Sequence, residues 1–370
     1  MTGMRRRPAG PKLAAILAVG FGVLTAFVTT TPARAEPVEV RIGFAQIGVG
    51  NREYGSGNTL AVVHAGDYLR DAFPEGEVRL RWSFFKGAGP AVNEAIANGQ
   101  LDFALQGDLP SIVGRANGLE TRIIAASGIR SNLYLAATPA SGITSVEDLR
   151  GRKVAQFRGT NLQLATDKVL AAHGLGERDV KFINMDFPTA TAALATGDID
   201  AAFGQADFLG LEEKGIARIV YNTKGDDPAF TRHAHLLVTR AFEAKHPEIV
   251  QKIVTGLVRA AAWASDEANR EELFRIWGLS GVPVGIFRAD FDGTPLAERS
   301  TPRLDAFLFA RYADQAEAAR KHGLIRRPVD IEGWFEPRYV ETAIRDLGID
   351  ADRLWPRHDA TGAVIAGGGS

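Results

Sequence analysis

The sequence contains no cysteine among its 370 residues. This absence excludes disulfide bonds, cysteine nucleophiles and thiolate metal sites. It also excludes a lipoprotein, because the lipid of a lipoprotein is attached to a cysteine just after the leader. Whatever this protein binds or converts, thiol chemistry of its own side chains plays no part.

An excess of basic residues is also missing. The chain has 43 Lys and Arg residues against 44 Asp and Glu, and without five basic residues of an N-terminal leader the balance becomes 38 against 44. A mildly acidic protein of this kind is a poor partner for nucleic acid, which attracts basic surfaces. We therefore expect no nucleic-acid partner.

Motifs of common enzymes and nucleotide-binding proteins are absent from the sequence. There is no G-x-S-x-G or H-E-x-x-H, and the glycines at 55 and 57 fit neither G-x-G-x-x-G nor a P-loop. His233 and His235 alternate along an expected strand, but no acidic partner accompanies them as a metal site requires. The sequence therefore predicts a protein that is not an enzyme and has neither a metal nor a cofactor.

The N-terminus has the three parts of a secretory signal peptide. Basic residues at 5–7 and 12 precede an apolar run at 13–28, and residues 33–35 form an A-x-A site. The apolar run is short for a membrane span of about 20 residues. We therefore predict cleavage after Ala35 and release into the periplasm, with either Sec or twin-arginine export left open.

One short phrase occurs twice in the sequence. Residues 95–104 read AIANGQLDFA, and residues 193–202 read ALATGDIDAA. Each copy is typical of a helix closed by a glycine and followed by a short apolar strand, because glycine suits the left-handed cap of a helix. Asp102 and Asp200 recur in the two copies, which favours a role in the fold. The distance between the copies predicts two similar α/β domains whose facing surfaces form a ligand cleft.

Hydrophobic patterns predict alternating strands and helices along most of the chain. Expected strands cover 38–44, 78–84, 101–105, 123–126, 133–137, 153–157, 180–185 and 235–239. Expected helices cover 60–72, 90–99, 110–117, 144–150, 161–173, 189–196, 247–265, 267–277 and 304–322. The expected strand at 235–239 returns the chain to domain one, and the helix at 247–265 follows it. Thr144 and Glu147 have the spacing of a capping box. This alternation favours mainly parallel sheets with helices on both faces.

Polar residues at the ends of expected strands are the candidates for ligand binding. The strongest is the turn from Arg158 to Asn161, where a helix begins and its free N–H groups attract anions. An ordinary helix cap explains the same residues equally well. Gln106, Gly107 and Asp108 have the same position in domain one, although Asp108 also suits a helix cap.

Two other positions are further candidates for ligand binding. Arg130 precedes the strand that joins the domains and has the planar group that pairs with an acid, although a surface salt bridge is an equal alternative. Lys86 and the glycine-rich loop at 48–58 also follow expected strands.

Residues 145–155, SVEDLRGRKVA, followed by Arg158 and Gly159, carry a family resemblance. The phrase resembles the periplasmic substrate-binding proteins for aliphatic sulfonates, taurine and nitrate that serve ABC importers. The resemblance extends over roughly 38–355 and includes both copies of the repeated phrase. It departs from a common family pattern at 203–208, where relatives often carry Trp-Asp-Pro and this chain has FGQADF.

The resemblance implies a two-lobed periplasmic binding protein of the α/β class, type II-like, with a mainly parallel sheet and helices on both faces in each lobe. The predicted divisions are a signal peptide at 1–35, lobe 1 at 36–136 plus 236–358, lobe 2 at 137–235 and a flexible tail at 359–370. Hinge closure near 133–137 and 235–239 would trap the ligand.

The implied function is capture of a small anionic ligand, an aliphatic sulfonate, by a monomer that delivers it to an ABC permease and ATPase complex. Taurine, nitrate or a pyrimidine precursor is the alternative ligand, and a sensor or a secreted enzyme the alternative role. The departure at 203–208 favours a more polar sulfonate or another small anion. The predicted ligand-binding residues are Asn51, Lys86, Gln106, Gly107, Asp108, Arg130, Arg158, Gly159, Thr160, Asn161, Gln205 and Asp207.

Overall fold

The computed structural model describes residues 36–74 and 76–365. The predicted signal peptide therefore lies outside the described residues. Among the helices of the described part, none has the length and apolarity that a membrane crossing needs.

The first of two five-stranded sheets combines four strands from the first part of the chain with one that returns much later. Its order is β2 (Val78–Phe84), β1 (Val38–Phe44), β3 (Phe103–Gly107), β10 (Ala234–Thr239) and β4 (Thr121–Ala126). The pairs β1–β2 and β1–β3 are parallel, whereas β10 runs antiparallel to both of its neighbours. The return of the strand at 235–239 to the first domain is thus confirmed.

The second sheet repeats this arrangement. Its order is β7 (Lys181–Asn184), β6 (Lys153–Gln156), β8 (Ala201–Gly204), β5 (Tyr134–Ala137) and β9 (Arg218–Asn222). β6 is parallel to β7 and β8, and β5 is antiparallel to both of its neighbours. In each sheet the antiparallel strand, β10 or β5, is the first strand that the chain forms after it crosses from the other sheet. Two mainly parallel sheets with helices confirm the predicted fold class.

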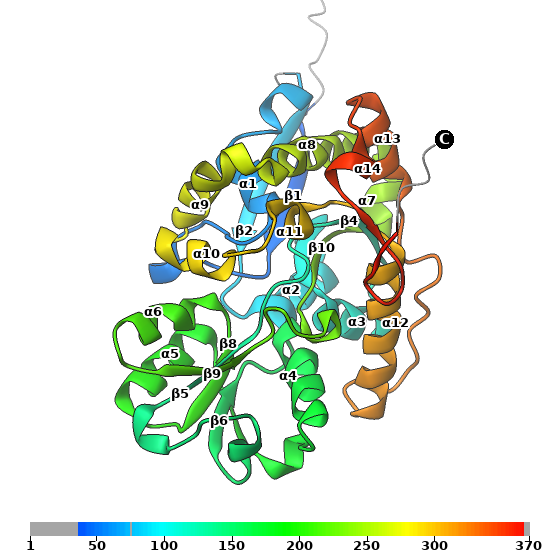
Figure 1. Cartoon of the computed structure of the whole chain (residues 1–370). Helices are drawn as coiled ribbons and strands as arrows, with labels where there is room; N and C mark the ends of the chain where they lie inside the picture. The colour runs from blue at the N-terminus through cyan, green and yellow to red at the C-terminus, as the bar shows by residue number, and fades with distance from the viewer. Residues whose placement is uncertain (1–35, 75, 366–370) are drawn as a thin grey trace, which may run out of the picture. The chain divides into compact units, whose positions relative to one another are not determined.

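Helices cover the sheets in the way that the apolar side chains require (Figure 1). One face of the first sheet packs on α1 (Thr59–Ala65), α8 (Pro247–Ser265) and α13 (Arg338–Asp346), and the other on α2 (Ala88–Ala97). α3 (Asp108–Ala116) packs on α12 (Ala306–Lys321) around Tyr312. We call the first sheet with these helices the first lobe.

The second sheet carries α4 (Asn161–Ala172), α5 (Phe187–Thr196) and α6 (Leu209–Glu213), which together we call the second lobe. The remaining helices are α7 (Arg240–Lys245), α9 (Arg270–Gly278), α10 (Val284–Asp290), α11 (Leu296–Ser300) and α14 (Ala351–Leu354).

Two expected helices are shorter than predicted. The one at 60–72 ends at Ala65, because Gly66 caps it and Asp67 adopts a positive φ of 53° before a 3-10 turn at Arg70–Ala72. The one at 144–150 is a 3-10 turn at Glu147–Leu149.

The sequence predicts Glu147 as the partner of Thr144 in a capping box, and this prediction is wrong. Asp148 Oδ2 accepts the Thr144 N–H at 2.8 Å and the hydroxyl at 2.9 Å, whereas Glu147 contacts Nδ1 of His173 at 2.7 Å.

Segment boundaries also differ from the expected ones at two places. The predicted limit between lobes at 136/137 falls inside β5, whose residues from Tyr134 onward pair with β8 and β9. Part of the predicted tail is ordered, since β12 (Val364–Ile365) pairs with β11 (Arg357–His358). Asp359 Oδ1 stabilises that hairpin by accepting the N–H groups of Thr361 and Ala363 at 2.8 and 3.0 Å.

The repeated phrase has the same structural task in both lobes. Gly99 and Gly197 have φ values of 65° and 76°, and the strands that follow them hold the same position in the two sheets. Asp102 Oδ2 accepts the N–H of Arg41 at 2.9 Å, and Asp200 Oδ2 accepts that of Lys153 at 2.8 Å. Each aspartate therefore fixes the parallel strand beside its own, β1 in the first sheet and β6 in the second, as the predicted role in the fold requires.

Replacement of Asp102 tests this role. Asp102→Ala leaves the Arg41 N–H without its acceptor and breaks two bonds to the Arg41 side chain, so the free energy of unfolding should fall by about 1–3 kcal/mol. Asp200→Ala should lower it less, because one backbone bond is lost. Urea unfolding measures both. Asp198→Ala, on the exposed turn of the second copy, is the matched control and should change stability little.

Candidate functional site

Two crossing segments connect the lobes, and they are bonded to each other. Ser131 and Arg232 exchange backbone N–H···O bonds of 2.9 Å in both directions. Ala234 also donates its N–H to Gly128 O at 3.1 Å. These bonds make a short two-stranded connection, about which predicted site residues of both lobes gather.

The ends of β3 and the start of α4 meet beside this connection. A Cβ on Gly107 would lie 2.7 Å from Asn161 Cβ, so the two lobes touch there. The carbonyl of His233 accepts the Asp108 N–H at 3.2 Å and Asn161 Nδ2 at 3.4 Å. The structure thus brings Gly107, Asp108 and Asn161 together, two from the first lobe and one from the second.

The turn before α4 also faces the first lobe. Gly159 has a φ of 74°, and a Cβ there would lie 3.2 Å from Pro90 Cγ. Thr160 accepts the Leu162 N–H at 3.3 Å and donates to Phe157 O at 2.7 Å, so its hydroxyl is engaged in capping the helix. The ordinary cap that the sequence left open is therefore present at Thr160.

Charged predicted residues at the edges of the site have partners of their own. Lys86 Nζ lies 3.8 Å from Asp186 Oδ2 of the second lobe, which makes an ion pair across the lobes. Arg158 lies 3.6 Å from Glu177 within the second lobe. Asn51 is exposed with a φ of 62°, and the N–H of Val49 in the same turn is bonded to Ser280 O at 2.7 Å.

The side chain of Gln106 is hydrogen-bonded within the interior of the first lobe, and its role as a ligand contact stays a prediction. Its Nε2 donates to Asn93 Oδ1 at 2.8 Å and to Gly89 O at 3.0 Å, while its Oε1 accepts the Ser111 hydroxyl at 3.0 Å. Its side chain is 1% exposed. With both ends of the amide bonded inside the protein, Gln106 positions α2 and α3.

His235 continues the same buried chain of hydrogen bonds. Tyr312 OH contacts its Nδ1, and its Nε2 lies 3.0 Å from Ser111 Oγ. Burial lowers the pKa of His235 to about 3, so the ring is neutral. In the consistent assignment Tyr312 donates to His235, which donates to Ser111, which donates to Gln106. The chain joins β3, β10, α3 and α12.

The carboxylate of Asp108 accepts a backbone N–H at the start of α3. Its Oδ1 accepts the Leu109 N–H at 2.7 Å, and Pro110 has no N–H to offer. Burial raises its pKa to about 6, against the opposing effect of the Leu109 hydrogen bond. The start of α3 is thus capped by its own carboxylate, and ligand binding at Gly107 and Asp108 stays a prediction.

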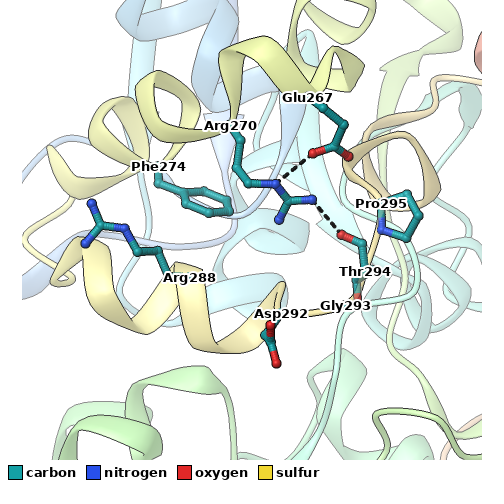
Figure 2. Close-up of a pocket in the computed structure, with 8 residues that line it drawn as sticks. All are labelled: Glu267, Arg270, Phe274, Arg288, Asp292, Gly293, Thr294 and Pro295. Atoms are coloured by element: carbon teal, nitrogen blue, oxygen red, sulfur yellow. Dashed lines mark hydrogen bonds and ion pairs between the residues drawn. The ribbon is translucent and has the colours of Figure 1, made fainter.

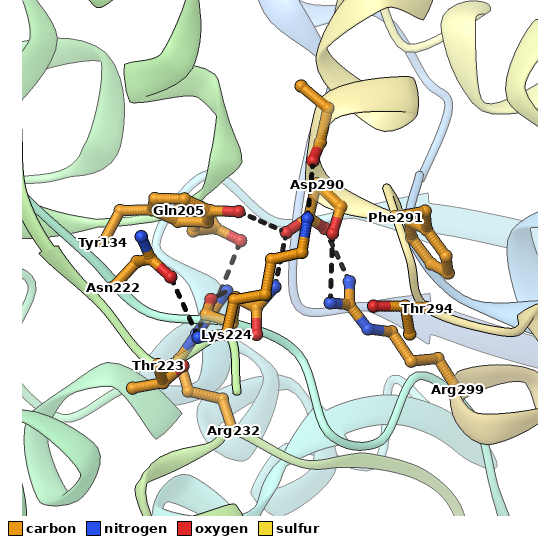
Figure 3. Close-up of polar contacts among 12 residues, drawn as sticks. Tyr134, Gln205, Asn222, Thr223, Lys224, Arg232, Asp290, Phe291, Thr294 and Arg299 are labelled. Carbon is orange, nitrogen blue, oxygen red and sulfur yellow. Dashed lines mark hydrogen bonds and ion pairs between the residues drawn. The ribbon is translucent and has the colours of Figure 1, made fainter. Parts of the chain in front are cut away.

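Arg232 is the central charge of the site, and it was missed from the sequence (Figure 3). It is 6% exposed, its Nε and Nη2 donate to Asn132 O at 3.2 and 2.7 Å, and its Nη1 donates to Gln205 Oε1 at 3.3 Å. Burial lowers its pKa to about 10, which leaves it charged at neutral pH. Gln205, at the end of β8, thus accepts a hydrogen bond from a buried cation on the crossing segment.

Asp207 lies in the same buried region, where Arg232 acts on its carboxylate. Burial raises its pKa to about 6, although Thr191 and Arg232 act to lower it. Its Oδ2 lies 3.4 Å from the Thr191 hydroxyl, and its Oδ1 is buried without a hydrogen-bond partner among the described residues.

A second buried network ties α10 to the second lobe. Asp290 Oδ1 accepts Tyr134 OH at 2.6 Å and Asn132 Nδ2 at 2.9 Å, while its Oδ2 pairs with Arg299 at 2.6 Å (Figure 3). Burial acts to raise the pKa of Asp290, but Arg299 and these donors hold it below its usual value. Asn132 and Arg232 could have been suspected from the sequence, because they lie beside the expected crossing strands. Asp290 and Arg299 carry no such signal in the sequence.

A family model described as NMT1/THI5 like matches residues 85–270, half of the chain. The putative aliphatic sulfonates-binding protein of Bacillus subtilis (strain 168) is 30% identical over 62% of this chain and 67% of its own length. The Escherichia coli (strain K12) protein of the same description is 23% identical over 84% and 92%. The chain belongs to the NMT1/THI5-like family.

Solved structures agree with this membership. The putative periplasmic sulfonate-binding protein SsuA from Methylobacillus flagellatus superposes with a TM-score of 0.75, is 28% identical, and the match covers 88% of this chain and 98% of that one. The alkanesulfonate-binding protein from Xanthomonas axonopodis bound to MOPS has a TM-score of 0.68 at 24% identity over 82% and 99%, which shows the shared fold. The predicted family is therefore confirmed.

Enzymes also share the fold of this NMT1/THI5-like protein. A 2'-hydroxybiphenyl-2-sulfinate desulfinase of Rhodococcus erythropolis is 26% identical over 41% of each chain. A desulfurization enzyme of the same fold has a TM-score of 0.63 at 17% identity over 84% of this chain and 99% of that one. The fold by itself therefore does not separate binding from catalysis.

A hollow of about 440 Å³ lies on the first-lobe helices, apart from the predicted ligand residues (Figure 2). Arg270 in its wall donates to Glu267, Phe291 O and Thr294 O, so its guanidinium is engaged. Its lining residues are Glu267, Arg270, Phe274, Arg288, Asp292, Gly293, Thr294 and Pro295. Among the residues that the structure describes, no cluster of His, Cys, Asp or Glu suits a metal ion.

The contact between Gly107 and Asn161 gives a test of lobe approach. Gly107 has an ordinary φ of −78°, so Gly107→Ala keeps its backbone conformation but sets a methyl 2.7 Å from Asn161 Cβ. The lobes must separate to accept it, and we expect an increased radius of gyration in X-ray scattering and a melting temperature (Tm) lower by a few degrees.

Two further variants separate this effect from general damage. Asn161→Gly added to Gly107→Ala removes the opposing Cβ and should restore the radius. Gly285→Ala, where a Cβ meets open space, is the matched control. An unchanged radius in Gly107→Ala would contradict the contact.

Proposed function

We propose that this protein is the periplasmic solute-binding component of an ABC importer and captures a small organic sulfonate between its lobes. The observation that carries the proposal is the buried guanidinium of Arg232 at the connection between the lobes. A fixed cation in a low-dielectric surrounding attracts an anion more strongly than one in water. Relatives with sulfonate-binding names support the choice of anion.

We assign the ligand's acidic group to the space among Arg232, Gln205 and the turn that starts α4. Arg232 supplies charge, and the first N–H groups of α4 at Thr160 and Asn161 supply donors, because a helix start leaves such groups free. Gln205 and Asp207 give a polar wall, which favours a sulfonate with further polar groups. Gln106, Asp108 and Arg130 are left out of this assignment because their side chains lie in other contacts.

Release and capture would follow from motion about the crossing segments. Besides those segments, contacts such as Lys86–Asp186, Lys168–Asp314 and Tyr134–Asp290 join the two parts, and such motion would have to break them. Export by the leader at 1–35 would deliver the protein to the periplasm, and a permease and ATPase complex would take the ligand from a monomer.

A sulfinate-converting enzyme is the second candidate, because desulfinases are among the relatives. One solved desulfinase was a cysteine-to-serine mutant with bound biphenyl-2-sulfinic acid. The present chain has no cysteine, so it has no thiol for such chemistry. Incubation with biphenyl-2-sulfinate and assay for released sulfite separates the candidates. Sulfite release would favour the enzyme, and its absence with measurable sulfonate binding favours the solute-binding role.

Removal of the Arg232 charge should weaken binding. Arg232→Gln is expected to raise the Kd for an alkanesulfonate or MOPS, measured by calorimetry, about 10- to 100-fold, since hydrogen bonds to a charged group contribute about 1.5–3 kcal/mol. Arg345→Gln, whose side chain is 71% exposed, is the matched control. Unchanged affinity in a folded Arg232→Gln variant would reject this assignment.

Protonation of Asp207 should make binding depend on pH. The pKa of Asp207 in the free protein is about 6, so its negative charge is present above that pH and is lost below it. An anionic ligand should therefore bind several-fold more tightly at pH 5 than at pH 7.5.

Two carboxyl variants locate the source of this dependence. Asp207→Asn should remove most of the change in Kd between pH 5 and 7.5. Asp167→Asn, which alters another buried carboxyl of raised pKa, on α4, should retain it. Equal pH dependence in the wild type and Asp207→Asn would contradict the prediction.

A further inference from the structure

The side of the crossing segments that faces α12 holds basic groups around one aromatic ring. The guanidinium carbon of Arg130 lies 4.7 Å from the centre of the Phe307 ring, and that of Arg311 lies 5.6 Å from it. The His233 ring packs edge-on against Phe307 with its centre 5.6 Å away. Arg130 and His233 come from the two crossing segments, and Phe307 and Arg311 from α12.

Several N–H donors in this cluster have no acceptor. Nε and Nη2 of Arg130 and Nε of Arg311 are buried without a hydrogen-bond partner among the described residues. His233 Nδ1 accepts the Arg130 N–H at 3.3 Å, so the proton of the neutral ring belongs on Nε2. That Nε2 is also buried and has no partner within the described chain. His233 itself is 0% exposed.

The nearby carboxylates are engaged elsewhere. Asp305 Oδ1 accepts the Leu308 N–H at 3.0 Å, and its Oδ2 lies 3.2 Å from Nδ1 of His358. Asp314 pairs with Lys168 and lies 3.9 Å from Nη1 of Arg311. Arg130 is in none of the ion pairs of the described residues, although Asp305 and Glu298 act on its charge at longer range. The cluster therefore presents more positive charge and more donors than its own acceptors satisfy.

The backbone at Arg130 is strained in a way that preserves this arrangement. Its φ of 52° is in the left-handed region, which a residue with a Cβ seldom adopts. Such strain persists where the surroundings impose it and is concentrated at functional sites. Here the backbone bonds between Ser131 and Arg232 fix the next residue, so the Arg130 side chain is held toward Phe307.

We propose that Arg130, His233 and Arg311 form a site for a small inorganic anion, chloride in the first place, on the α12 side of the crossing segments. A monatomic anion suits buried donors of this kind because it accepts several N–H groups without needing a donor in return. The bound anion would join both crossing segments to α12. This site is separate from the sulfonate site assigned to Arg232, and it does not depend on the proposed function.

Thermal unfolding of the protein, purified without chloride, tests the site. At pH 7.5 and constant ionic strength, replacement of gluconate by chloride should raise Tm saturably, by about 2–4 °C at high occupancy. Bromide should act like chloride. Arg311→Gln should abolish the rise, and Arg345→Gln, an exposed control, should keep it. The same Tm in both salts, or an equal rise in Arg311→Gln, would overturn the proposal.

A sulfonate titration of the same variant distinguishes the two sites. Arg311→Gln should lose the chloride response and retain the Tm rise caused by an alkanesulfonate. If the chloride-dependent rise in Tm disappears only in Arg232→Gln, the anion binds at the proposed sulfonate site. That result would overturn the proposed anion site at Arg130, His233 and Arg311.

Bromide-soaked crystals of the unmodified protein give an independent test if a variant fails to fold. The expected result is an anomalous peak within about 3.5 Å of N–H groups of Arg130 and His233. A water at that position, or no peak there beside peaks elsewhere, would overturn the proposal.

Discussion

The backbone pairing of Ser131 with Arg232 is the constraint on which the rest of the molecule depends. Two bonds of 2.9 Å join the only two places where the described chain passes between the sheets. The pairing sets the direction in which β5 enters the second sheet and β10 enters the first. It also fixes the neighbours Arg130, Asn132 and His233, whose side chains and carbonyls then reach into both lobes.

Buried polar groups around this connection are paired so that each lobe stays rigid while the connection remains narrow. Gln106, Ser111, His235 and Tyr312 satisfy one another inside the first lobe, and Asp290 collects donors from Tyr134, Asn132 and Arg299. Fully satisfied networks of this type specify a unique arrangement, since a missing partner leaves a costly buried group. Several buried polar atoms lack a hydrogen-bond partner among the described residues, and we assign functional meaning to those of Arg130, His233, Arg311 and Asp207.

The residues of the repeated phrase show how far pattern alone leads. The recurrence of Asp102 and Asp200 predicts a role in the fold, and each binds the parallel strand beside its own, β1 or β6. Gln106 also stands at the end of a repeated strand, yet its amide is bonded inward to Asn93 and Ser111. The sequence places a polar residue at a strand end, but the direction of its side chain depends on helices whose packing is not local. Arg232 was missed for the same reason.

The sequence by itself determined the α/β class, the two like halves and the family, because these follow from local periodicity, glycine caps and contiguous motifs. It also determined the exclusion of thiol chemistry, since a missing residue type is absent from every fold. The tertiary structure alone decided which charges are buried together. Arg232 meets Gln205, and Asp290 meets Tyr134, only because the chain crosses between the sheets twice and α10 packs on the second lobe. Contacts between residues so distant in sequence are set by the packing of whole lobes, to which no local pattern is sensitive.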